Sequence, residues 1–108
     1  YGNEVENYTL KIAMCSVNGE SSGIEIIQPV SGEGVHKDFV TAGKNGLHHI
    51  AFKVDDFDYW REFFVTKGSR FVFESETEDP LNGYRRCFYA EDKENNMIYE
   101  IKEMARFR

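Results

Sequence analysis

Residues 46–56 read GLHHIAFKVDD, and this stretch decides the fold of the chain. Two adjacent histidines open an apolar run, and two aspartates close it. The run predicts a β-strand over residues 47–54, on which neighbouring side chains point to opposite faces. His48 then lies on the apolar face that should pack against a helix, together with Ile50, Phe52 and Val54. His49 lies on the other face, beside Ala51 and Lys53, and is free to face a pocket as a metal ligand or a base.

Length, composition and charge describe one small acidic domain. The chain has 108 residues, of which 41% are hydrophobic and 15% aromatic, and this suits a packed globular protein with a single core. Its formal net charge is -6. That charge argues against nucleic-acid binding, which needs a basic face, and against electrostatic attachment to an anionic membrane.

The sequence shows no signal for secretion or for a membrane. No run approaches the roughly 20 apolar residues that span a bilayer, and no basic-then-apolar segment opens the chain. Cys15 and Cys87 lie far apart inside apolar runs, so we expect two buried thiols and not a disulfide. A cytoplasmic enzyme or binding protein fits these observations best.

Hydrophobic periodicity and turn residues predict the order of the elements. Helical spacing places Trp60 and Phe64 in a core stripe, with Asp55 or Asp56 as the cap before it and Gly68 as the stop after it. The acidic residues 74–79 are expected in a solvated loop. Strands are expected over residues 7–17, 24–30, 47–54, 70–74, 84–90 and 97–103, with a hairpin turn at Asn18-Gly19 and a short helix over residues 35–42.

Three blocks of this sequence, taken in order, resemble the vicinal oxygen chelate superfamily. They are residues 24–29 (IEIIQP), residues 46–56 and residues 98–102 (IYEIK). That superfamily includes glyoxalase I, methylmalonyl-CoA epimerase, bleomycin resistance proteins and extradiol dioxygenases, and the His-His block looks closest to the epimerase and glyoxalase I branches. The resemblance implies an α+β fold in which paired β-α-β-β-β modules form a cupped, incomplete barrel.

The resemblance also implies how a single glyoxalase-like domain over residues 1–108 is organised. Residues 46–108 are expected to form a complete second module, and residues 1–45 a partial first module. Tyr1 is not a methionine, and the first strand and helix of the first module have no counterpart here. The first module is therefore expected to be truncated at its amino terminus.

The resemblance implies a divalent metal site. Its ligands are Glu25 from the last strand of the first module, and His49 and Glu100 from the first and last strands of the second. A fourth ligand, usually a histidine on the first strand of the first module, is missing, and His36 falls in the wrong segment to replace it. One histidine and two carboxylates suit Zn, Ni, Co, Mn or Fe.

The residues themselves support this assignment and also allow simpler interpretations. Glu25 and Glu100 interrupt apolar runs, where a carboxylate is costly to bury unless it is paired or metal-bound. Either glutamate can instead lie on the wet face of an antiparallel sheet. His49 can be a hydrogen-bonded structural histidine, and His48 is interpreted as a supporting or structural residue.

The resemblance implies a metal-dependent isomerase or lyase. The metal stabilises an enediolate while a carboxylate, assigned to Glu100, moves the proton next to the carbonyl. The resemblance implies a thioester substrate if the protein is similar to the epimerase. It implies a hemithioacetal substrate if the protein is similar to lactoylglutathione lyase. The alternative is a metal-free small-molecule binding module of the bleomycin-resistance type.

The partial first module has a consequence for assembly. A half-sheet without its first strand and helix has an unpaired edge and an uncovered face, and exposed edges invite partners. We therefore expect a homodimer or a fragment that completes itself by strand exchange.

Overall fold

The computed structural model describes residues 8–16, 23–44, 46–81 and 83–103. The described residues up to Gly46 form one unit, and those from Leu47 onward form a second unit. The chain contains both helices and antiparallel and parallel strands, so the α+β class that the sequence predicts is confirmed. No helix in the described part of the chain is long and apolar enough to cross a membrane.

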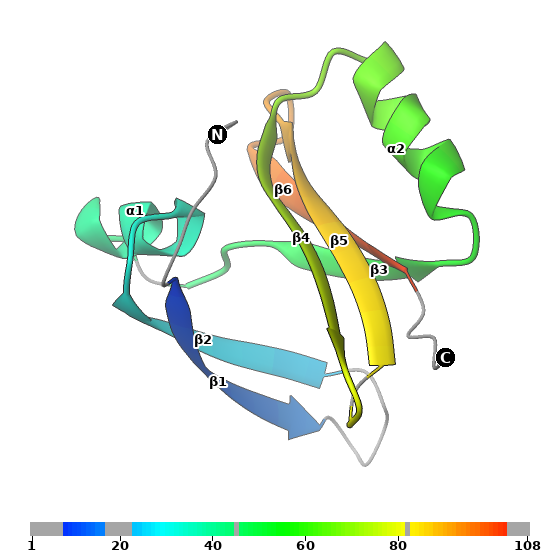
Figure 1. The fold of residues 1–108 in the computed structure, drawn as a ribbon. Helices are drawn as coiled ribbons and strands as arrows, with labels where there is room; N and C mark the ends of the chain where they lie inside the picture. Colours follow the sequence, from blue (N-terminus) through cyan, green and yellow to red (C-terminus); the bar gives the residue numbers. More distant parts are fainter. Residues whose placement is uncertain (1–7, 17–22, 45, 82, 104–108) are drawn as a thin grey trace. The chain divides into compact units, whose positions relative to one another are not determined.

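The amino-terminal unit is a β-hairpin followed by a short helix (Figure 1). Strands β1 (Thr9–Ser16) and β2 (Gly23–Ser31) pair antiparallel, as predicted, and the predicted turn at Asn18-Gly19 lies outside the described residues. Helix α1 (Val35–Thr41) follows, and Gly43 at φ 77° takes the left-handed conformation that ends it.

The carboxy-terminal unit is a β-α-β-β-β module. It contains β3 (Ile50–Val54), α2 (Phe57–Thr66), β4 (Phe71–Asp79), β5 (Gly83–Asp92) and β6 (Met97–Glu103). The strands form one sheet in the order β3-β6-β5-β4, in which β3 and β6 are parallel and the other pairs antiparallel. Helix α2 lies on one face of this sheet (Figure 1). The expected second module is therefore present in its full element order.

The core of this unit lies between α2 and the sheet. Phe88 is completely buried, its ring stacks on Phe71 at 4.8 Å between centroids, and it meets Phe57 and Phe64 edge-on. Trp60 also packs against this cluster, so the predicted core stripe of α2 is confirmed. The side chain of Asp56 accepts a hydrogen bond from the Tyr59 backbone N–H at 3.0 Å and caps the helix.

Two predicted strand boundaries are wrong. The strand expected over residues 47–54 begins only at Ile50, so His48 and His49 precede it. The acidic residues 74–79, expected in a loop, continue β4 to Asp79. There Glu76 accepts from the Tyr84 hydroxyl at 2.9 Å and Asp79 from Arg85 at 2.9 Å, so cross-strand bonds hold a polar hairpin that periodicity does not reveal.

Two burial predictions also need correction. Phe52 is 50% exposed and Ile50 40% exposed, whereas only Val54 of the predicted helix-facing trio packs against the core. Strand β3 is at the edge of its sheet, so fewer neighbours cover it. Cys15, which we expect to be buried, is exposed on the hairpin, and Cys87 is half-buried.

Candidate metal centre

His48 and His49 lie side by side at the entrance to β3. Their rings meet edge-on with centroids 5.1 Å apart, and the two Nδ1 atoms are 2.8 Å apart. The prediction that they face opposite sides of the sheet is wrong, because alternation applies only within a strand and β3 starts at Ile50. Both rings instead approach the ring of Tyr89, at 6.1 Å and 4.5 Å.

Glu100 meets His49 from the neighbouring strand. Strand β6 pairs with β3 in parallel and sets Glu100 opposite Ala51, two residues beyond His49. The Nε2 atom of His49 and the Oε1 atom of Glu100 are 3.0 Å apart, and the two side chains are only 8% and 9% exposed. Since Ile101 packs in the core under α2, its neighbour Glu100 points to the opposite face of the sheet.

Two opposing effects set the ionisation of Glu100. Burial acts to raise the pKa of its carboxyl, because desolvation disfavours the charged form. The hydrogen bond with His49, assisted by Lys102 and the Cys87 thiol, more than offsets burial and holds the pKa below its ordinary value of 4.5. Glu100 is therefore an ionised carboxylate at neutral pH, which is the form that binds a metal.

The His49–Glu100 pair fits a divalent ion. Imidazole nitrogen and carboxylate oxygen are the donor set of zinc and of the other first-row divalent metals. Two adjacent ligand atoms, each about 2.1 Å from one ion, lie about 3 Å apart. The 3.0 Å between Nε2 and Oε1 is close to that separation and is also the length of a hydrogen bond, so the distance is compatible with both arrangements.

Glu25, the third predicted ligand, lies in the amino-terminal unit. It is on β2, opposite Met14, and its side chain is exposed. Within the carboxy-terminal unit, the structure joins the predicted site residues His49 and Glu100 directly.

Sequence reasoning missed Tyr89 and Cys87 as neighbours of this site. Tyr89 is 5% exposed and pairs with Glu100 in the β5–β6 register, and its ring tilts over His49 at 35°. Cys87 is two residues earlier on the same strand and on the same face. Alternation along residues 84–90 places Cys87 and Tyr89 on one face of their strand. Only the pairing of this strand with β6 shows that this is the face of Glu100.

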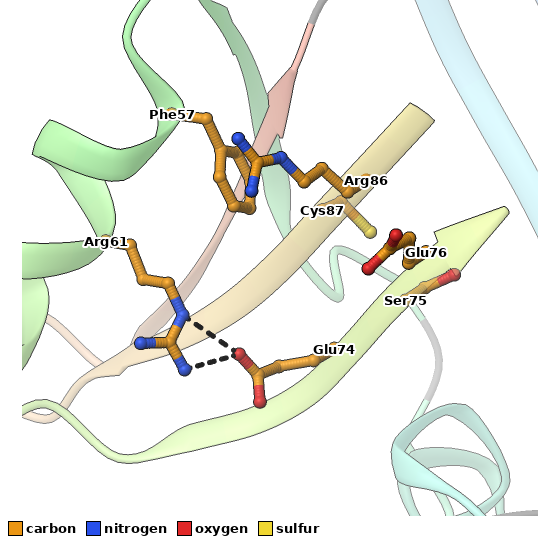
Figure 2. A pocket seen from close by; sticks show the side chains of 7 residues that line it. All are labelled: Phe57, Arg61, Glu74, Ser75, Glu76, Arg86 and Cys87. Atoms are coloured by element: carbon orange, nitrogen blue, oxygen red, sulfur yellow. Dashed lines mark hydrogen bonds and ion pairs between the residues drawn. The ribbon is translucent and has the colours of Figure 1, made fainter. Parts of the chain in front are cut away.

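A second feature is a hollow of about 320 Å³ between α2 and strands β4 and β5 (Figure 2). Arg61 donates to Glu74 at 3.0 Å, and Arg86 lies 4.3 Å over the Phe57 ring while it pairs with Glu103 at 2.7 Å. Both guanidinium groups are thus already bound to carboxylates. The other lining residues are Ser75, Glu76 and Cys87. We interpret the contacts of these two guanidinium groups as interactions that hold α2 against the sheet.

The fold and the buried pair define a small α+β protein with a β-α-β-β-β module and a histidine–carboxylate site. Residues 2–88 match the model of the Glyoxalase/Bleomycin resistance protein/Dioxygenase superfamily. The chain belongs to this superfamily, as its resemblance to vicinal oxygen chelate proteins predicts. Searches of curated proteins and of solved structures gave no significant match.

Proposed function

We propose that this protein is a metal-dependent isomerase or lyase that moves a proton next to a carbonyl group. The observation that carries the proposal is the buried pair of His49 and Glu100, which meet at 3.0 Å on the sheet face opposite α2. The substrate classes that we propose are a thioester, for an epimerase-like reaction, and a hemithioacetal, for a lyase-like reaction.

Each residue of the pair has a role in this proposal. His49 Nε2 and Glu100 Oε1 would hold the divalent ion, and Tyr89 covers one face of the imidazole at 4.5 Å. A bound ion polarises substrate oxygens as a Lewis acid and so acidifies the adjacent C–H. Glu100 is the ionised carboxylate at this position, and we assign to it the transfer of that proton.

Glu25 completes the ligand set that the superfamily resemblance implies. A conservative Glu25→Gln substitution removes its charge on an exposed strand position, where it should not affect folding. If Glu25 is a ligand, this variant binds Zn²⁺ more weakly than the wild type. Unchanged affinity would leave His49 and Glu100 as the only protein ligands of this proposal.

The competing function is a metal-free binding module. It is favoured by the observation that His49 and Glu100 already satisfy each other as a hydrogen-bonded pair. The net charge of -6 also suits capture of a cationic small molecule. In that case substitution of His49 or Glu100 leaves ligand binding intact.

The deciding experiment is elemental analysis of protein purified without chelators or a histidine tag. We expect about one divalent ion per chain in the wild type, no ion in His49→Ala, and the wild-type content in Leu47→Ala, which changes an exposed neighbour. Metal-loaded protein is then assayed for exchange of the substrate C–H in D₂O with thioesters and hemithioacetals. Absence of metal from the wild type would refute the proposal and favour the binding module.

A further inference from the structure

The imidazole of His49 is held at both of its nitrogens. Nε2 is 3.0 Å from Glu100 Oε1, and Nδ1 is 2.8 Å from Nδ1 of His48. The ring of Tyr89 lies against one face of His49 and reaches toward His48 as well. All four residues belong to the carboxy-terminal unit, so this arrangement is internal to one module.

The hydrogen bond between the two histidines limits where the protons can be. A contact between two Nδ1 atoms at 2.8 Å needs one donor and one acceptor. A metal on Nε2 of His49 uses the lone pair of that nitrogen, so the proton of the neutral ring must be on Nδ1. His48 must then accept at Nδ1. Without metal the direction is reversed, because Nε2 of His49 donates to the ionised Glu100 carboxylate and Nδ1 of His49 accepts from Nδ1 of His48.

We propose that His48 is a positioning residue that fixes the orientation of the His49 ring through the contact between the two Nδ1 atoms. This inference rests on the proposed metal-dependent function. A ligating histidine commonly donates its second N–H to a carbonyl or a carboxylate, which sets its orientation. Here the acceptor is a neighbouring imidazole. In this proposal the adjacent histidines are one ligand, His49, and the residue that orients it, His48.

The test compares three variants that differ only at this segment. His48→Leu keeps the bulk of the side chain and removes the hydrogen-bond partner of His49 Nδ1, whereas His48→Asn places an amide group, which can accept or donate, near the position of Nδ1. Leu47→Ala is the matched control, because Leu47 is 69% exposed. Zn²⁺ affinity is measured by competition with a chromogenic chelator. The ¹⁵N shifts of the His49 ring are measured in Zn²⁺-free protein, and unfolding curves check that each variant is folded.

The expected result is a loss of about 10- to 100-fold in Zn²⁺ affinity for His48→Leu, with much of it recovered in His48→Asn. The Nδ1 shift of His49 should move in His48→Leu and stay in place in Leu47→Ala. Wild-type affinity and an unmoved Nδ1 shift in a folded His48→Leu protein would overturn the inference. If the wild type binds no Zn²⁺, the proposed function fails, and the Nδ1 shift alone then decides whether His48 positions His49.

Discussion

At the scale of single residues, His49 stabilises the folded state as the partner of a buried charge. Replacing His49 with alanine leaves the Glu100 carboxylate buried without the hydrogen bond of its partner, although Lys102 and the Cys87 thiol still act on it. Breaking one side of a buried pair costs on the order of 3 kcal/mol, because the remaining charge is desolvated without compensation. We expect that loss in urea unfolding of metal-free protein, with Leu47→Ala as the control. A loss no larger than the control shows would contradict it.

The lowered pKa of Glu100 predicts how stability depends on pH. A carboxyl whose pKa is lower in the folded state than in the unfolded state stabilises the protein when it is ionised. The contribution is fully present above the ordinary value of 4.5 and is lost as the pH falls through the lower folded value. With a chelator present, the unfolding free energy of the wild type should fall more steeply than that of Glu100→Gln as the pH decreases below 4.5. Parallel curves would contradict the prediction.

The sequence identifies His49 and Glu100 as candidate site residues, but it does not show that they are in contact. Glu100 is a candidate because a carboxylate between Tyr99 and Ile101 is costly to bury unless it is paired or bound to a metal. Its contact with His49 spans 51 positions and depends on parallel pairing of β3 with β6, which sequence spacing does not encode. The argument from alternation failed at His48, because a side chain just before a strand is placed by local contacts and not by the pleat.

At the scale of elements, α2 shows which local signals are reliable. Its start follows from the Asp56 cap and its end from Gly68, which takes a φ of 75°. The sequence indicates both ends by residue type, since an aspartate precedes the helix and a glycine follows it. Asp56→Ala should cost about 1 kcal/mol of unfolding free energy, because the Tyr59 N–H loses its acceptor. Asp55→Ala, at the exposed neighbouring position, is the control in the same chemical denaturation experiment. Equal losses in the two variants would show that the cap contributes nothing specific.

Strand β4 shows the opposite case, in which local signals fail. Residues 74–79 are acidic and carry little hydrophobic alternation, so they predict a loop. They form a strand because β4 is an edge strand whose polar side chains find partners across the hairpin, in Tyr84 and Arg85 on β5. Charged side chains on an edge also discourage pairing with other chains. The residues that hold this segment in a strand therefore lie on the partner strand β5 and not in the segment itself.

At the scale of the whole molecule, the buried apolar residues are distributed unequally. Among the described residues, the buried hydrophobic side chains of the carboxy-terminal unit include Phe57, Phe88 and Ile101, whereas Val35 alone belongs to the amino-terminal unit. A two-stranded hairpin is marginally stable by itself in water. Among the described residues, most of the buried apolar side chains thus lie in the carboxy-terminal module, and we expect the hairpin to be stabilised by further contacts.

A second copy of this chain is the partner that we expect to supply those contacts. Ile24 and Ile26 share one face of β2 and are 61% and 58% exposed, and a face of this kind marks an interaction site. We expect sedimentation velocity to show a monomer–dimer equilibrium that depends on concentration, and Ile26→Lys to shift it toward the monomer. Leu81→Lys, at an 84% exposed position in the β4–β5 turn, is the control and should leave it unchanged. A wild type that stays monomeric at every concentration would mean that the hairpin is stabilised within its own chain.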